Sequence, residues 1–278
     1  MNNYNFKKMV KNIGFLLCFS LIATVACAQR GWEVGGWVGT SHYFGDLNTS
    51  FDISRPGLAV GGVARYNYNE RLCLKFSAGY GSVSADDANS SNAFEKRRNL
   101  SFRSKIIDAT AQFEFNFLPY RHGSSDEFFT PYLFGGLSVY NFNPETKYNG
   151  KWVELRPLGT EGQFRGEEYY STLLALAYGG GFKIDLTPVW SLNVEVSARK
   201  LFSDYLDDVS GSYPNSADLQ KLRGKVAVEL SDRSLLDAEG KKLGQTGRQR
   251  GNSQNKDTYV FTSIGLVYYF GSLDCPTW

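Results

Sequence analysis

Eight stretches of the chain alternate, residue by residue, between apolar side chains and small or polar ones. In the clearest, residues 106–117, every odd position from Ile107 to Phe117 is apolar and every even position from Asp108 to Asn116 is polar. The other seven lie at about residues 32–44, 58–68, 72–81, 129–140, 174–186, 190–199 and 260–270. Successive side chains of a β-strand point to opposite faces, so a period of two predicts strands. The chain is therefore expected to be all-β, with eight strands.

The connections between these stretches alternate between short and long. Residues 69–71 and 187–189 are tight turns, and residues 118–127 form a connection of intermediate length. The long, polar connections are residues 45–54, 85–102, 143–170 and 203–257. A membrane barrel has short turns at one end and long loops at the other, and it usually closes with an even number of strands. The spacing therefore favours an eight-stranded antiparallel barrel, with residues 203–257 as its longest loop.

Alternation alone also fits a soluble, lipocalin-like barrel, so the kind of side chain on each face decides between the two. The less apolar face is built from small residues, as at residues 77–81 and 175–181, which suit a crowded barrel interior. Several stretches are long enough to cross a bilayer at a tilt, and aromatic residues gather towards their ends, as at a membrane interface. These features predict an eight-stranded antiparallel up-and-down transmembrane β-barrel with long extracellular loops.

The first 28 residues have the three parts of a secretory signal peptide. Lys7, Lys8 and Lys11 form a basic region, residues 13–25 are an apolar run, and Ala26-Cys27-Ala28 has the small-x-small pattern of a cleavage site. The apolar run is too short to remain as a membrane-spanning helix. Acylation of the cysteine, as in a lipoprotein, is the alternative, but the Leu-like residue usually found three positions before such a cysteine is missing. We therefore predict a signal peptide cleaved after residue 28 and export to the Gram-negative outer membrane.

Residues 29–278 then form a single barrel domain, whose charge differs from that of the whole chain. The whole chain carries 30 Lys and Arg against 28 Asp and Glu, and three of the lysines belong to the predicted signal peptide. The exported barrel has a net charge of −1 as a result. This balance gives no reason to expect nucleic acid as a partner, whereas outer-membrane lipid is expected to surround the barrel.

Charged side chains fall on the inward face of the predicted strands. An ion path or a substrate pocket is one interpretation. However, the interior of an eight-stranded barrel is filled by side chains, and buried charges have to be paired. We therefore predict a packed inward charge network made of Glu33, Arg65, Lys75, Asp108, Glu114, Lys183, Asp185, Glu195 and Arg199.

No arrangement of residues points to catalysis. A hydrolase or acyltransferase needs a base beside a nucleophile, and the only two histidines, His42 and His122, are predicted on the lipid side of a strand and in a turn. Neither faces an inward serine with an acidic residue to orient it. We therefore expect no enzymatic activity, no catalytic residue and no cofactor.

The longest loop contains three further features. Asp204, Asp207 and Asp208 could bind a hard cation, but their spacing matches no calcium loop, so solvent-exposed aspartates and no metal site are expected. Residues 216–231 carry apolar side chains at helical spacing and predict a short helix that packs over the barrel rim. Residues 244–256 are rich in Gly, Gln, Asn and Arg and are expected to be mobile and solvated.

Two cysteines remain after the predicted cleavage. Cys73 starts the third predicted strand on its inward face, and Cys275 follows the last strand by five residues. Both positions belong to the periplasmic rim, in a compartment where disulfides persist. A disulfide between Cys73 and Cys275 and a pair of free thiols are both compatible with the sequence.

The sequence resembles those of the PorG-like outer-membrane β-barrel proteins of the type IX secretion and gliding machinery. The stretches that carry the resemblance are WEVGG (32–36), SHYFGDLN (41–48), DDANS (86–90), NLSFRS (99–104), FTPYLF (129–134), KYNGKW (147–152), PLGTEG (157–162) and DYLDDVSG (204–211). The resemblance implies an outer-membrane location and association with periplasmic ring proteins of the PorK–PorN type and other secretion components. It implies a structural, anchoring role and not a reaction.

The sequence leaves three functions to be distinguished. The first is a non-enzymatic anchoring component of the type IX secretion system, as the resemblance implies. The second is a free-standing structural or adhesive outer-membrane barrel unrelated to secretion, which shares every feature described above. The third, a barrel enzyme or a soluble ligand carrier, conflicts with the histidine positions and with the small inward residues. The first is the prediction, and the second is its alternative.

Overall fold

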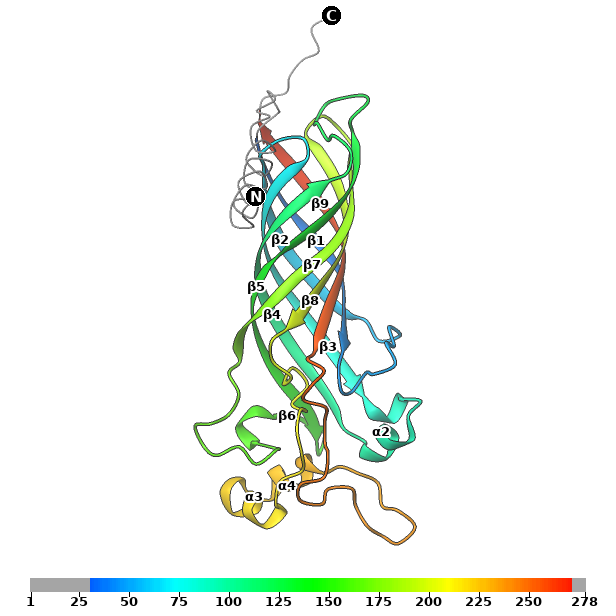
Figure 1. Cartoon of the computed structure of the whole chain (residues 1–278), viewed down its shortest axis with the longest axis vertical. Coiled ribbons are helices and arrows are strands. Elements are labelled where there is room, and N and C mark those ends of the chain that lie inside the picture. The colour runs from blue at the N-terminus through cyan, green and yellow to red at the C-terminus, as the bar shows by residue number, and fades with distance from the viewer. Residues whose placement is uncertain (1–30, 272–278) are drawn as a thin grey trace, which may run out of the picture.

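Eight long antiparallel strands close into a barrel in the computed structural model, which describes residues 31–271 (Figure 1). These strands are β1 (Gly31–Phe44), β2 (Gly57–Asn67), β3 (Leu72–Asp86), β4 (Ser101–Asn116), β5 (Phe129–Tyr148), β7 (Thr172–Asp185), β8 (Trp190–Leu201) and β9 (Thr258–Gly271). Strands that follow one another in the barrel are paired, and β1 pairs with β9 to close it. The predicted eight-stranded up-and-down barrel is therefore confirmed. The predicted signal peptide, residues 1–28, lies outside the described residues.

The segment from residue 143 to 170, expected to be one long loop, begins with an extension of β5. This strand continues to Tyr148 and turns back into the short strand β6 (Lys151–Glu154). The turn uses Asn149 and Gly150, whose φ angles are 49° and 79°, the positive values that an Asn-Gly hairpin turn needs. The expected loop start is therefore wrong here, because the strand ends at this turn and not where its apolar alternation fades.

The two ends of the barrel differ, as the connections predict. Short turns join the strands at the end where Gly31 pairs with Gly271, which we call the turn end. At the other end, residues 45–56, 87–100, 149–171 and 202–257 form what we call the loop cap, seen below the barrel in Figure 1. Its helical elements are η1 (Asp87–Asn89), α2 (Ala93–Arg98), η2 (Arg156–Leu158), α3 (Ser216–Arg223) and α4 (Lys225–Ser231).

The helix predicted over residues 216–231 forms as two shorter ones. Gly224, at φ 89°, breaks it between α3 and α4. Leu219 and Leu230, from the predicted apolar stripe, are buried in the loop cap. Within the described part of the chain, no helix is long and apolar enough to cross a membrane.

Glycines on the inward face leave room for aromatic side chains inside the barrel. A Cβ atom added to Gly81 would lie 2.8 Å from the ring of Phe261, and one added to Gly79 would lie 2.9 Å from the ring of Trp37. Both distances are too short for real contacts, so each glycine leaves the space that the neighbouring ring fills. The small inward residues noted in the sequence are thus explained by particular rings that pack against them.

Candidate functional site

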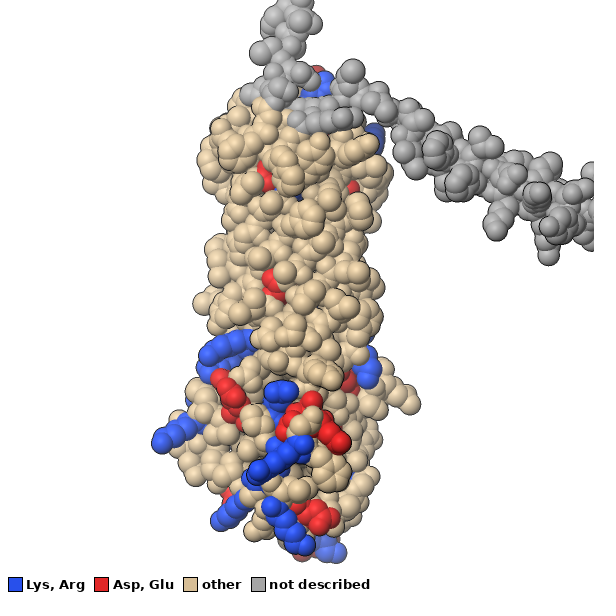
Figure 2. Space-filling model, turned by 90° about the vertical axis from the view of Figure 1, so that its left-hand side faces the viewer, with Lys and Arg blue, Asp and Glu red and all other residues tan. Residues whose placement is uncertain are grey.

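The outer surface of the barrel is an apolar belt. It includes the exposed side chains of Trp32, Val34, Val38, Leu58, Val60, Leu72, Phe76, Tyr80, Ile107, Phe113, Phe115, Leu133, Leu137, Val139, Leu174, Leu176, Tyr178, Phe182, Trp190, Val194, Val196, Ile264, Leu266 and Phe270. Figure 2 shows few charged side chains over this region and many over the loop cap. Soluble proteins seldom expose apolar patches beyond a few hundred Å², whereas lipid-facing barrels present such a band. The belt is therefore suited to span a bilayer.

The inward face carries an ion-pair network centred on Glu114. Its carboxylate oxygens lie 2.8 Å from Arg65 Nε, 2.6 Å from Lys183 Nζ and 3.5 Å from Lys75 Nζ. Lys75 also pairs with Glu195 on the opposite side of the interior. All five side chains are buried. Each buried charge thus has an oppositely charged partner, which offsets the cost of removing it from water.

The network continues towards the turn end through Glu33. Arg65 Nη1 lies 2.5 Å from Glu33 Oε2, and Asn67 Nδ2 donates a hydrogen bond of 2.5 Å to Glu33 Oε1. His122 folds into the barrel mouth, with Nε2 3.1 Å from Glu33 Oε1 and Nδ1 3.0 Å from Asp185 Oδ1. The sequence placed His122 in a turn without a role. Periodicity gives no sign that this turn bends inward.

His122 completes the charge balance of the interior. Burial lowers the pKa of His122, but the carboxylates of Asp185 and Glu33 outweigh burial and raise it to about 9. The predicted network has five carboxylates and four basic side chains, so the protonated imidazole supplies the fifth positive charge. The ring also stacks on Tyr269, with centroids 4.3 Å apart.

Two of the nine predicted network residues form a separate pair. Arg199 Nε lies 3.0 Å from Asp108 Oδ2, which also accepts a hydrogen bond of 3.2 Å from the Tyr259 hydroxyl. The structure connects the other seven, directly or through His122: Glu33, Arg65, Lys75, Glu114, Lys183, Asp185 and Glu195. All nine predicted residues thus point inward, seven of them in one connected group and two in a separate pair.

Little open space remains beside this network. A cavity next to Trp37, Arg65 and Glu195 has a volume of about 20 Å³, which is room for about one water molecule. The interior is filled by side chains, as an eight-stranded barrel requires. The arrangement holds charges in fixed pairs and offers no space for a substrate at this level of the barrel.

Cys73 lies inside the turn end, as its register predicts. Its side chain is buried, and its sulfur lies 3.7 Å from Lys183 Nζ and 3.7 Å from Asn116 Nδ2. Cys275 lies outside the described residues, so the disulfide between the two cysteines stays a prediction.

Two buried arginines hold the loop cap together. Arg98 of α2 pairs with Asp87 at 2.7 Å and donates to the backbone oxygens of Arg250 at 2.7 Å and Asp46 at 2.6 Å. Arg250 in turn lies 3.0 Å from Glu161 and donates to the backbone oxygen of Asp208 at 2.5 Å. Residues from all four loops are thereby joined. The expectation of a solvated segment over residues 244–256 is wrong at Arg250, which is buried.

Aspartates gather beneath these arginines, where the loop cap meets the barrel. The Tyr43 hydroxyl donates to Asp207 Oδ2 at 2.5 Å and lies 3.1 Å from Asp257 Oδ1. Asp204, Asp207 and Asp208 are each at most 2% exposed, so the expectation of solvent-exposed aspartates is wrong. Their burial depends on loop–loop packing, which the sequence does not display. Among residues 31–271, no group of three or more His, Cys, Asp or Glu side chains is placed to hold a metal ion.

Burial changes the protonation of these aspartates. It raises the pKa of Asp204 to about 7 and that of Asp46 to about 6. Burial, with the negative charge of Asp257 nearby, also raises the pKa of Asp207 well above its usual range. The Ser210 hydroxyl stabilises charged Asp204, but neither carboxylate oxygen of Asp204 has a hydrogen bond of normal geometry.

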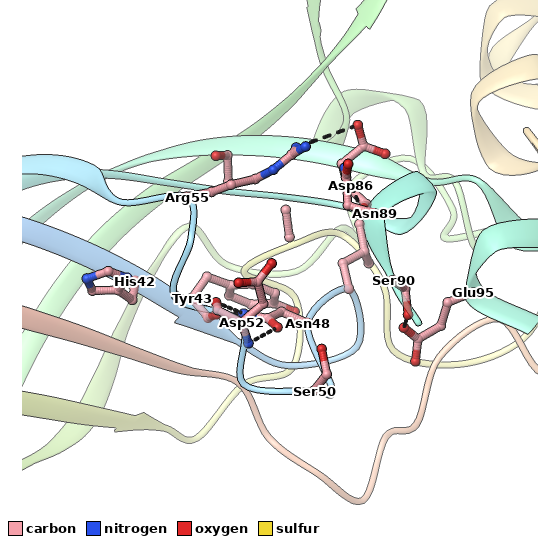
Figure 3. Close-up of a pocket in the computed structure, with 13 residues that line it drawn as sticks. His42, Tyr43, Asn48, Ser50, Asp52, Arg55, Asp86, Asn89, Ser90 and Glu95 are labelled. Atoms are coloured by element: carbon pink, nitrogen blue, oxygen red, sulfur yellow. Dashed lines mark hydrogen bonds and ion pairs between the residues drawn. The ribbon is translucent and has the colours of Figure 1, made fainter. Parts of the chain in front are cut away.

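A small polar pocket lies between the β1–β2 and β3–β4 loops (Figure 3). Figure 3 shows Arg55 reaching towards Asp86, at 3.9 Å, and Ser90 bonded to Glu95 at 2.5 Å. The pocket has a volume of about 30 Å³. It therefore has room for about one water molecule and not for a substrate. His42, which also lines it, lies 3.2 Å from the Thr40 hydroxyl.

A family model described as a domain of unknown function (DUF6089) matches residues 11–232. The search of curated proteins gives no significant match.

Similar solved structures include three bacterial surface barrels. The first is Neisserial surface protein A, with 13% identity, a TM-score of 0.43, and coverage of 86% of this chain and 97% of the other. OprG, an outer membrane protein from Pseudomonas aeruginosa, has 12% identity, a TM-score of 0.43, and coverage of 88% and 98%. Ail, the attachment invasion locus protein of Yersinia pestis, has 11% identity, a TM-score of 0.41, and coverage of 87% and 99%. Similarity at this level says nothing about function.

Proposed function

The chain belongs to the DUF6089 family, and we propose that it is a non-enzymatic outer-membrane barrel with an anchoring role in the type IX protein secretion system. The observation that carries the structural role is the combination of an apolar belt outside with a paired charge network inside. Such a barrel is held by lipid but passes little through its interior. What it provides is a fixed position in the membrane, with surfaces exposed at both ends.

The link to secretion is supported by the resemblance to PorG-like proteins. Under this proposal, periplasmic ring proteins of the PorK–PorN type and other secretion components bind the turn end. Among residues 31–271, the turn between β4 and β5 is the longest connection at this end, and it is held to the barrel by the Arg121–Glu70 and His122–Asp185 pairs. A turn fixed in this way loses little conformational freedom when a partner binds it.

Affinity purification tests the partners. The full chain, tagged in the loop cap, is purified from detergent-solubilised membranes, with an equally tagged, unrelated barrel of the same membrane as the control. Ring proteins should be recovered with this chain and not with the control. Recovery of no secretion component above the control level would rule out the secretion role.

Membrane location and the closed interior are tested separately. Density-gradient fractionation should place the protein with outer-membrane markers, and recovery in the soluble fraction would contradict the proposal. In planar bilayers the purified barrel should give no steady conductance, because side chains occupy the interior. A stable open channel would favour transport over anchoring.

A free-standing structural or adhesive barrel is the second candidate. The observation that favours it is the loop cap, which has its own buried side chains, such as Leu155, Leu206, Leu219 and Leu230. A folded cap presents a defined surface to the outside, as an adhesin needs. Binding of the purified protein to host or neighbouring cells, without recovery of ring proteins, would favour this candidate over the first.

A further inference from the structure

Basic side chains face outward at the loop ends of β4 and β5. On β4, successive outward side chains change from Ile107 to Lys105 and then to Arg103. Outward positions on one strand are about 7 Å apart, so Lys105 lies directly above the apolar belt and Arg103 one step beyond. With Lys147 on β5 and Arg55 before β2, they form what we call the basic rim (Arg55, Arg103, Lys105 and Lys147).

An exposed indole accompanies the basic rim. The guanidinium carbon of Arg103 lies 3.7 Å from the ring centroid of Trp152 in β6, and Lys147 Nζ lies 5.3 Å from it. The Trp152 side chain is 43% exposed, so part of it is open to a ligand. Tryptophan is favoured at membrane interfaces, where one side of the ring is apolar and the other is wet.

The basic rim borders a groove with unused hydrogen-bond donors. The groove has a volume of about 280 Å³ and is lined by Arg55, Arg103, Lys147, Trp152 and nearby serines of β3 and β4. Its acids are few: Asp86 lies 3.9 Å from Arg55, and Glu145 lies 2.6 Å from Arg103. A guanidinium has five donors, and the hydrogen bond from Arg103 to Glu145 uses its Nη2 atom.

We propose that the basic rim and Trp152 bind the phosphorylated sugar headgroup of an outer-leaflet glycolipid of the lipid A type. The height of the rim places its cations where the phosphates of such a lipid lie when its acyl chains cover the belt. Arginine recognises phosphate through paired hydrogen bonds, lysine adds attraction to an anionic surface, and the indole ring packs on a sugar. The inference rests on the outer-membrane location in the proposed function, but not on the secretion role.

Native mass spectrometry of the full barrel in detergent, titrated with diphosphoryl lipid A, tests the site. A K105Q/K147Q variant removes two exposed charges and should bind lipid A on the order of tenfold more weakly. The matched control is K221Q/K241Q, which removes two exposed lysines of the loop cap away from the groove. Equal weakening in both variants, or none in the first, would overturn the proposal. Heat-modifiable gel migration confirms that each variant is folded.

Other ligands separate the glycolipid from simpler anions. Lipid A without phosphates and inorganic phosphate alone should both bind more weakly than diphosphoryl lipid A. Trp152→Leu should weaken lipid A binding and leave phosphatidylglycerol binding unchanged. Equal binding of phosphatidylglycerol and lipid A by the unmodified protein would overturn the glycolipid assignment. Because purified protein is used, failure here is distinct from failure to recover ring proteins or to fractionate with the outer membrane.

Discussion

The Nε2 atom of His122 lies 3.1 Å from Oε1 of Glu33, so a turn residue is tied to the first strand of the barrel. This contact joins the β4–β5 turn to the interior network. The other ring nitrogen of His122, Nδ1, lies 3.0 Å from Oδ1 of Asp185. The imidazolium therefore lies between two carboxylates and supplies a positive charge to both. His122 thereby holds the β4–β5 turn against β1 and β7.

Replacing His122 by glutamine should destabilise the barrel by about 3 kcal/mol, because it leaves buried carboxylates without a charged partner. The pKa of His122 is raised from 6.5 to about 9 in the folded protein. The stability that the charged His122 adds to the folded barrel is therefore complete below pH 6.5 and is lost as the pH rises through about 9. Thermal unfolding in detergent, followed by gel migration from pH 6 to pH 10, measures the difference between the two proteins.

The control for this experiment is His42→Gln, which removes the histidine outside the network. It should unfold with the same pH dependence as the unmodified protein. A stability difference between H122Q and the unmodified barrel that does not shrink above pH 9 would contradict the role assigned to His122.

Replacing Asp204 by asparagine should stabilise the loop cap at pH 8 by on the order of 2 kcal/mol. Burial raises the pKa of Asp204 to about 7, so its contribution to stability is complete below pH 3.8 and is lost as the pH rises through about 7. The advantage of the variant should therefore be smaller at pH 5 than at pH 8. Limited proteolysis in urea, with detection of loop fragments, measures it.

The exposed Asp126→Asn change in the β4–β5 turn is the control, since it alters the same charge outside the cap. It should leave the loop cleavage midpoint unchanged at both pH values. A D204N variant that is cleaved more easily than the unmodified protein at pH 8 would show that the charged carboxylate supports the cap.

Replacing Gly81 by alanine should destabilise the barrel by about 1–3 kcal/mol, because the added methyl group meets the ring of Phe261. Adding Phe261→Leu should restore part of the loss by making room. Gly135→Ala is the matched control, because nothing lies within 4 Å of its added Cβ. Unfolding temperatures in one detergent give the comparison, and equal temperatures for G81A and G135A would refute the size argument.

The strands and their faces could be predicted because a period of two is local information. Glu33, Glu114 and Lys183 were placed inside the barrel by parity alone, and the structure puts all three in one network. Pairing partners were harder to foresee. Parity gives a face, but contacts such as Lys75–Glu195 depend on the strand tilt and on the register across the barrel.

The loop cap could not be predicted for a related reason. Its contacts join residues far apart in the sequence, as Arg98 joins Asp46 and Arg250, and loops have no period that shows which side chains are buried. Asp204 and Arg250 therefore looked like solvated loop residues. Apart from the start of the loop expected at residue 143, the long connections lie where they were predicted, but the sequence does not show that they fold together.

Arg98→Lys should loosen the loop cap and leave the barrel intact. Lysine keeps the charge near Asp87 but cannot also reach the two backbone oxygens that the guanidinium bonds, those of Asp46 and Arg250. Limited proteolysis should therefore cut the loops sooner, while the heat-modifiable migration of the barrel stays unchanged. Arg248→Lys, at an exposed position of the same cap, should be cut at the unmodified rate. If R98K and R248K are cleaved equally, the loop cap does not depend on the hydrogen bonds of the Arg98 guanidinium.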